Sequence, residues 1–215
     1  MNILAIDGAL SRAGVAVVSS DGVVLARQFA PGRPGLIETL PELVQSCLAK
    51  AGVPIGAAAV TIGPGSFTGL RTTIAIAQGY TAAAGVPLLG VTVAEAFGVA
   101  FPVLHRPLWV AIRARREKIF LIRNGVAEGF ADADIPIIRT PVAVAGNAAN
   151  EVAAHIAAAG GNVILTNARE IDPAWVATAA RARHEAGLAP LAAQPVYVDP
   201  PEAKLPAGGL RPEPV

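Results

Sequence analysis

The chain carries the stretch Gly63-Pro64-Gly65-Ser66-Phe67-Thr68-Gly69-Leu70-Arg71 between an apolar run and a long helical pattern. Glycines and a proline in this position predict that a strand over residues 57–62 enters a tight turn, which opens onto a helix over about residues 68–84. The first N–H groups of a helix have no intrahelical partners and lie at the positive end of its dipole. The stretch is therefore a natural site for an anion or for a closely approaching chain.

Two interpretations of this glycine stretch are open. As a functional site, N–H groups near Ser66 and Thr68 hold an anion, and Arg71 supplies a countercharge. As a structural element, the glycines permit the turn, Ser66 or Thr68 caps the helix, and Phe67 fills the core. No lysine follows the last glycine, as it does in a Walker loop. The candidate anion- or nucleotide-binding residues, which include the end of the first predicted strand, are Asp7, Gly8, Gly65, Ser66, Thr68 and Arg71.

The composition of the chain indicates a packed globular protein. Of its 215 residues, 53% are hydrophobic and 15% are charged, which suits one large domain or two small ones. The net charge of +1 is too small to predict a nucleic-acid-binding surface. A single cysteine, Cys47, excludes an intrachain disulfide and fits a reducing compartment. Because Asp7 breaks the first apolar run and no apolar stretch reaches about 20 residues, we expect a cytoplasmic protein without a signal peptide or membrane contact.

The first half of the chain predicts three strands followed by alternating helices and strands. Apolar residues at helical spacing predict a helix over residues 36–48, in which Pro41 indicates a kink or a late start. Thr92 begins a further helix that runs to about residue 100. The predicted strands of this half are residues 2–6, 14–19, 23–29, 57–62 and 88–91.

The second half follows a boundary at residues 102–107. We expect Asn147 to cap a helix over residues 147–158, and Pro173 to stand at the first position of a helix over residues 172–185. The predicted strands of this half are residues 108–114, 118–123, 142–145 and 163–165. The chain is thereby divided into an N-terminal lobe (1–103), a smaller C-terminal α/β lobe (104–199) and a loosely ordered Pro-rich tail (200–215).

This order of elements predicts an α/β fold. An antiparallel meander that is followed by strands joined through crossover helices gives a mixed sheet. A second, smaller α/β unit follows it along the chain. We therefore expect an actin-like (ASKHA, ribonuclease H-like) architecture, in which two lobes with mixed sheets, flanked by helices, face a cleft.

Four segments together resemble the TsaB (YeaZ) family: Ile3-Leu4-Ala5-Ile6-Asp7, the glycine stretch, Pro195-Val196-Tyr197-Val198 and Ala203-Lys204-Leu205-Pro206. The resemblance is strongest over residues 1–100 and near the C-terminus. It implies a non-catalytic subunit that forms a heterodimer with TsaD, acts with the ATPase TsaE, and reaches tRNA through their complex. That complex makes threonylcarbamoyladenosine next to the anticodon. The chain itself is expected to bind no cofactor, while ATP or ADP and a metal belong to its partners.

The resemblance also implies a partner face. Its members use the two long helices of the first half to meet TsaD, or to form a homodimer when TsaD is absent. Small residues at spacing four in the second of these helices let another helix approach closely. The expected interface residues are Leu36, Leu40, Leu43, Val44, Cys47, Ala75, Gln78, Gly79, Ala82 and Ala83.

Other polar residues are assigned less specific roles. Asp7 corresponds to the phosphate-site aspartate of actin-like ATPases, but a strand-end turn is the favoured interpretation. The three histidines, His105, His155 and His184, lack the spacing of a metal-binding pair, so we expect no metal site. The family resemblance implies that the chain has no catalytic residue. A run of basic residues is interpreted as a solvated hairpin face rather than a tRNA contact: Arg113, Arg115, Arg116 and Lys118.

The sequence departs from the family at two places. Arg113 stands where many members have an acidic residue, and Pro34-Gly35-Leu36 where many have a histidine. The alternative function is an enzyme of the same fold that acts alone. It would be a phosphotransferase, or a TsaD-like metal-dependent acyltransferase or metallopeptidase.

Overall fold

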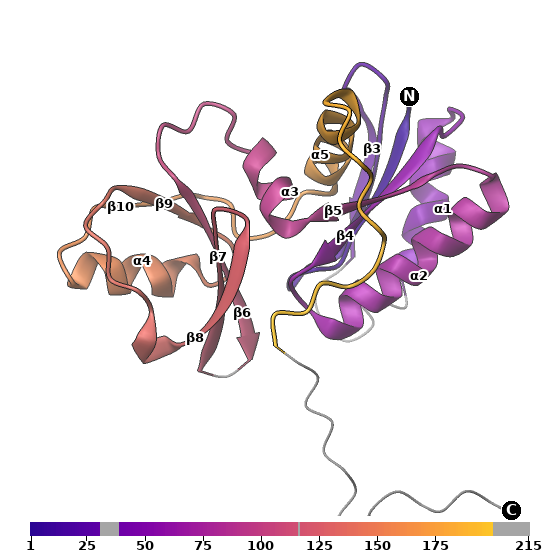
Figure 1. The fold of residues 1–215 in the computed structure, drawn as a ribbon. Coiled ribbons are helices and arrows are strands. Elements are labelled where there is room, and N and C mark those ends of the chain that lie inside the picture. Colours follow the sequence, from indigo (N-terminus) through magenta and orange to yellow (C-terminus); the bar gives the residue numbers. More distant parts are fainter. Residues whose placement is uncertain (31–38, 116, 200–215) are drawn as a thin grey trace, which may run out of the picture.

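A computed structural model of the chain describes residues 1–30, 39–115 and 117–199. Its strands form two five-stranded sheets that lie side by side, with helices packed on them (Figure 1). The first sheet has the order β3-β2-β1-β4-β5 and consists of β1 (Ile3–Asp7), β2 (Gly14–Val18), β3 (Val24–Phe29), β4 (Ala57–Gly63) and β5 (Leu88–Thr92). The second has the order β10-β9-β6-β7-β8 and consists of β6 (Leu108–Arg115), β7 (Lys118–Arg123), β8 (Val126–Ala131), β9 (Val142–Ala145) and β10 (Val163–Leu165).

The first sheet is mixed, as predicted. Strand β1 pairs antiparallel with β2 and parallel with β4, because β1 and β2 form a hairpin whereas β4 returns through a helix. Helices α1 (Leu40–Ala51) and α2 (Phe67–Ala84) cover one face, and α3 (Val93–Val99) and α5 (Pro173–Glu185) cover the other. Successive side chains of β1 alternate between the two faces and are all buried, which explains why this strand reads as a continuous apolar run.

Local signals set the ends of these helices. Helix α1 begins at Leu40 with Pro41 in its first turn, so the late start is confirmed, while residues 36–38 of the predicted helix lie outside the described residues. The hydroxyl of Ser66 accepts the N–H of Gly69 and caps α2. Thr92 and Glu95 cap α3 reciprocally.

The second sheet differs from prediction in two details. Strand β8, which pairs with β7, was not predicted, because its residues carry no clear apolar alternation. Asn147 is not the cap of α4 (Ala149–Ala158), which begins after Ala148 without a side-chain cap. Instead, the side-chain oxygen of Asn147 accepts the N–H of Arg113 at 2.8 Å and ties α4 to β6.

Helix α5 returns to the first sheet. It follows β10 of the second sheet, yet it packs on β1 and β2 (Figure 1). The chain then runs along β5, where the N–H of Gly90 donates to the carbonyl of Leu191 at 3.1 Å. The boundary at residues 102–107 stays a prediction. Residues 104–199 do not all pack with the second sheet, because α5 packs on the first. Within the described ranges, no helix is long and apolar enough to cross a membrane.

Candidate functional site

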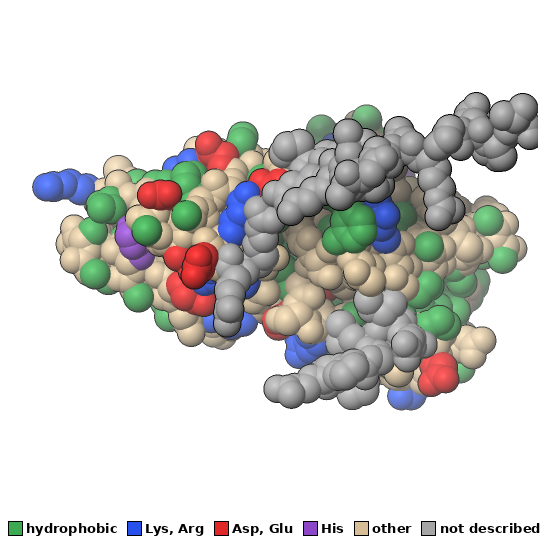
Figure 2. All heavy atoms as spheres, turned by 90° about the horizontal axis from the view of Figure 1, so that it is seen from below, with side chains coloured by type: hydrophobic (Ala, Val, Ile, Leu, Met, Phe, Trp, Pro, Cys, Tyr) green, Lys and Arg blue, Asp and Glu red, His purple; other side chains and the backbone are tan. Residues whose placement is uncertain are grey.

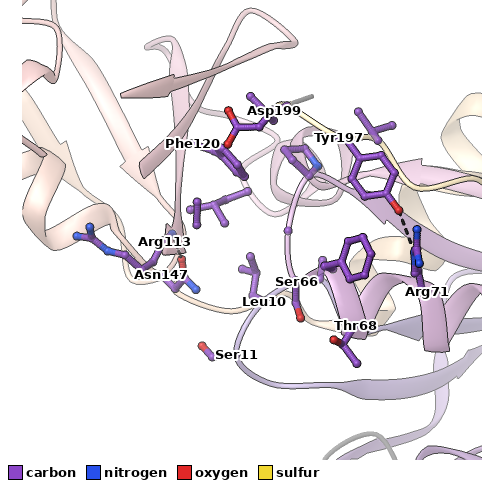
Figure 3. A pocket seen from close by; sticks show the side chains of 18 residues that line it. Leu10, Ser11, Ser66, Thr68, Arg71, Arg113, Phe120, Asn147, Tyr197 and Asp199 are labelled. Atoms are coloured by element: carbon purple, nitrogen blue, oxygen red, sulfur yellow. Dashed lines mark hydrogen bonds between the residues drawn. The ribbon is translucent and has the colours of Figure 1, made fainter. Parts of the chain in front are cut away.

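A cleft of about 1130 Å³ lies between the two sheets (Figure 3). Its walls come from the turn after β1, the glycine stretch, the hairpin of β6 and β7, and the segment 196–199. Four of the six candidate anion-binding residues line it: Gly65, Ser66, Thr68 and Arg71. Asp7 and Gly8 are absent from the described lining of this cleft.

The glycine stretch packs directly against the turn after β1. The N–H of Ser66 donates to the carbonyl of Ala9 at 2.7 Å. A Cβ atom on Gly65 would lie 2.1 Å from the same carbonyl oxygen, and one on Gly69 would lie 2.0 Å from the carbonyl oxygen of Gly8. These two positions require glycine because backbone touches backbone. The contacts support the structural interpretation, since the Ser66 N–H is already bonded and cannot serve an anion.

Phe67 does not fill the core. Its side chain is 56% exposed, so that part of the structural interpretation is wrong. The ring lies 5.8 Å from the ring of Tyr197, which is 48% exposed, and the guanidinium of Arg71 lies 3.9 Å from the Phe67 centroid. The Nε of Arg71 also donates to the Tyr197 hydroxyl at 3.0 Å (Figure 3). We call Phe67, Arg71 and Tyr197 the Phe67 cluster.

Sequence reasoning found only part of the Phe67 cluster. Arg71 was a candidate residue, whereas Tyr197 was noted only as part of a family segment. The two aromatic residues are far apart in the sequence, and no local pattern indicates that they meet. The available signal was the position of Phe67 immediately after a predicted helix cap, because the first turn of a helix at the end of a sheet commonly faces solvent.

Asp7 is fully buried at the end of β1. Its Oδ1 accepts the hydroxyl of Thr61 at 2.7 Å and the N–H of Ala9 at 3.2 Å. Its Oδ2 has no hydrogen-bond partner among the described residues. Burial raises the pKa of Asp7 from 3.8 to about 7, against the lowering effect of the two hydrogen bonds. This environment favours the strand-end role, because the bonded oxygen holds the turn that begins at Gly8.

The residues of the predicted partner face are partly buried inside the chain and partly exposed. Leu40, Val44 and Cys47 are buried between α1 and its own sheet, so their assignment to a partner interface was wrong. The apolar stripe of α1 packs on β2 and β3 because this contact buries the apolar side chains on that face of the sheet. Leu43 is half-buried, and Leu36 lies outside the described residues. The predicted residues of α2 are all exposed: Ala75, Gln78, Gly79, Ala82 and Ala83.

Two of the basic residues of the hairpin are paired with acids. The guanidinium of Arg113 contacts both carboxylate oxygens of Asp132, at 2.6 and 2.9 Å, and Glu151 at 3.2 Å. The ammonium of Lys118 lies 2.7 Å from both carboxylate oxygens of Asp199. Acidic and basic side chains are interspersed on the face seen in Figure 2. These pairs favour a structural role for the hairpin cations over a contact with phosphates. The side chain of Arg115 and all of Arg116 lie outside the description.

No group of three or more His, Cys, Asp or Glu side chains is close enough to hold a metal ion within residues 1–30, 39–115 and 117–199.

Two mixed sheets that face a cleft, with helices on both faces of the first, define an α/β protein of the actin-like fold. Two solved structures share this fold. The crystal structure of an uncharacterized Pseudomonas aeruginosa protein with similarity to peptidase YEAZ is 20% identical, with a TM-score of 0.73, over 92% of this chain and 99% of that one. YeaZ from Pseudomonas aeruginosa is also 20% identical, with a TM-score of 0.71, over 91% of this chain and 99% of that one.

The sequence itself matches a family model. Residues 35–164 match the model described as TsaD, tRNA N6-adenosine threonylcarbamoyltransferase. The tRNA threonylcarbamoyladenosine biosynthesis protein TsaB of Escherichia coli (strain K12) is 42% identical over 95 residues, which are 43% of this chain and 40% of that protein. The match thus spans about two fifths of the length of this relative. The chain belongs to the family of the matching model and, within it, to the TsaB (YeaZ) proteins, which confirms the predicted resemblance.

Proposed function

We propose that the chain is a non-catalytic partner subunit of a TsaD-containing complex that forms threonylcarbamoyladenosine in tRNA. The observation that supports this role is the exposed face of α2. A helix that packs on its own sheet with one side presents Ala75, Gly79 and Ala83 on the other, where small side chains let a second helix approach closely. Phe67 and Arg71 lie near the start of the same helix and contact Tyr197, so the Phe67 cluster adds aromatic and arginine side chains, which are enriched at binding hot spots.

The contacts of Asp7 support a non-catalytic role. Its carboxyl group is bonded to Thr61 and Ala9 inside the sheet, and the glycine stretch is packed on the turn that Asp7 holds. In an active enzyme of this fold the corresponding residues would position a phosphate. In this chain Asp7 and the glycine stretch instead hold two backbone turns in contact. ATP or ADP, the metal and the transfer chemistry are therefore assigned to TsaD and TsaE, and tRNA is reached through the complex.

The same face of α2 is proposed to form a homodimer when TsaD is absent. Because both assemblies would use this face, adding TsaD should convert the homodimer into the heterodimer. Light scattering of the pure chain, and of its mixture with TsaD, measures both states.

Reconstitution tests the proposed subunit role. TsaD, TsaE, ATP, threonylcarbamoyl adenylate as the group donor, and tRNA are incubated with and without this chain, and modified adenosine is measured by mass spectrometry. The variant Ala75→Glu places a charge on the α2 face, and Ala154→Glu places the same charge on an exposed position of α4 as a matched control. We expect modification only when the chain is present, its loss with Ala75→Glu, and its retention with Ala154→Glu. Equal modification without the chain, or with both variants, would contradict the proposal.

A separate arm tests the alternative of an enzyme acting alone. The purified chain is incubated with ATP, and phosphate release is measured for the wild type and for Asp7→Ala. We expect no turnover above background in either. Turnover that falls in Asp7→Ala would instead support an independent enzyme.

A further inference from the structure

A second cavity, of about 400 Å³, shares no lining residue with the cleft between the sheets. It lies where three segments meet: the turn after β1, the residues that follow α3, and the residues that lead into α5. Phe101 and Trp175 give it an apolar wall, and Trp175 also packs against Phe97 with ring centroids 6.0 Å apart. Nothing in the proposed role as a TsaD partner uses this cavity.

The acceptors around this cavity are already bonded. One carboxylate oxygen of Glu170 accepts the hydroxyl of Ser11, and the other accepts the N–H of Arg12 at 3.1 Å. One carboxylate oxygen of Asp172 pairs with the guanidinium of Arg27, and the other caps α5 by accepting the N–H of Ala174 at 3.0 Å. Each oxygen of these two carboxylates therefore already has a donor within the chain.

Three of the lining residues, by contrast, have side-chain donors without an acceptor among the described residues. The Arg12 side chain has no acceptor and no carboxylate partner in the part of the chain that the structure describes, and its Nε is buried. Its guanidinium carbon lies 3.8 Å from the centroid of the Phe29 ring, which holds it in place. The side-chain N–H groups of Asn167 and Trp175, which also line the cavity, have no acceptor among the described residues. Of these donors only the Arg12 Nε is buried, and a buried donor without an acceptor indicates that a ligand or water completes it. Asn167 is exposed and Trp175 is half-buried.

The formal charges around the cavity also favour an anionic ligand. Arg12 and Arg169 line the cavity with Glu170 and Asp172, and Arg27 pairs with Asp172. The lining itself holds two cations and two carboxylates, and Arg27, which is not a lining residue, neutralises Asp172, so that the five groups together have a formal charge of +1. Arg169 donates to the carbonyl of Thr166 and to the side chain of Asn150, so its charge is not balanced by an acid among its described partners.

We infer that this cavity binds an oxyanion, a carboxylate or a phosphate group, with Arg12 as its charged anchor. The planar guanidinium presents parallel N–H groups that match two oxygens of such a group. The Trp175 indole and the Asn167 amide donate to the remaining oxygens, and the apolar wall accommodates the organic part of the ligand. The anion comes either from a small molecule or from an acidic side chain, which have this chemistry in common.

Nuclear magnetic resonance of the whole chain, labelled with ¹⁵N, tests the inference. The two tryptophans give two indole N–H signals, and Trp175→Phe identifies the one that belongs to the cavity. The probes are inorganic phosphate, acetate and a glutamate blocked at both ends, each compared with chloride at constant ionic strength. We expect a saturable shift of the Trp175 signal. If only phosphate saturates the shift, the ligand is a phosphorylated small molecule. If acetate saturates it, the ligand is a small carboxylate. If blocked glutamate binds more tightly than acetate, the ligand is an acidic side chain.

Variants of Arg12 complete the test. Arg12→Gln should weaken binding by about tenfold or more, because it removes charge-assisted hydrogen bonds. Arg12→Lys keeps the charge without the planar fork and should weaken binding by less. Arg139→Gln, an exposed arginine outside the cavity, is the matched control and should bind as the wild type does. A shift that never saturates, that chloride reproduces, or that persists unchanged in Arg12→Lys and in folded Arg12→Gln would overturn the inference.

Discussion

Replacing Asp7 by Asn should stabilise the chain relative to the wild type, and more strongly as the pH rises from about 4 to 7. In the folded chain the pKa of Asp7 is raised from 3.8 to about 7 by burial. The unfolded chain loses this proton near pH 4, whereas the folded chain keeps it to about pH 7. Over this interval the unfolded state binds fewer protons, so the wild type loses stability as the pH rises. Below the interval the penalty is absent, and above it the penalty is constant.

The size of the effect follows from the pKa. A difference of about three pKa units corresponds to about 4 kcal/mol between the two ends of the interval. Asn has no charge to bury, and its side-chain oxygen can still accept the hydroxyl of Thr61 and the N–H of Ala9. Its NH₂ group takes the place of Oδ2, which has no partner among the described residues, so a small pH-independent cost is expected as well.

Urea unfolding at pH 4.5, 6 and 8, followed by circular dichroism, measures this difference. The quantity that matters is the free energy of unfolding of Asp7→Asn minus that of the wild type at each pH, because other titrating groups cancel. It should rise by a few kcal/mol from pH 4.5 to 8. Asp134→Asn, at an exposed aspartate, serves as the control and should show no such rise. A constant difference across the three pH values would refute the reasoning about Asp7.

Four further substitutions test the packing of the site and of α2. Gly65→Ala should cost roughly 3 kcal/mol or more of unfolding free energy, because its Cβ would lie 2.1 Å from the Ala9 carbonyl oxygen. Gly79→Ala, in open space on α2, should instead stabilise by about 0.5–1 kcal/mol, and denaturant titrations that rank the two in reverse would contradict the contact. Phe67→Ala should cost only about 0.5 kcal/mol because the ring is exposed, whereas a core ring would cost about 3–5 kcal/mol in the same titration. Lys118→Met should cost less than about 1 kcal/mol, since its pair with Asp199 is partly exposed, and a larger loss in thermal unfolding would show that the pair holds the sheets together.

The order of the elements could be predicted from the sequence because its signals are local. Apolar periodicity indicated nearly every helix and strand, and the caps at Ser66, Thr92 and Asp172 act within one helical turn. Pro41 marked the true start of α1 for the same reason. The weakly patterned β8 was missed, because its residues need the pairing with β7 to become a strand.

The site was less predictable because it depends on contacts between distant residues. The apolar stripe of α1 has the same pattern whether it covers its own sheet or a partner, so Leu40, Val44 and Cys47 were assigned to the wrong surface. The contact of Tyr197 with Phe67 depends on the path of the chain after α5. The partners of Arg113 and Lys118, likewise, are acids from other parts of the fold.

Because α5 returns to the first sheet, part of the core of that sheet can form only late in the synthesis of the chain. One face of β1 and β2 stays uncovered until residues 173–185 have left the ribosome, long after those strands have been synthesised. The nascent chain therefore presents a broad apolar surface for most of its synthesis, which is the situation in which chaperones bind and aggregation competes with folding. A fragment cut after residue 103 would keep that surface exposed permanently, so the first half should not be expected to behave as an independent folding unit.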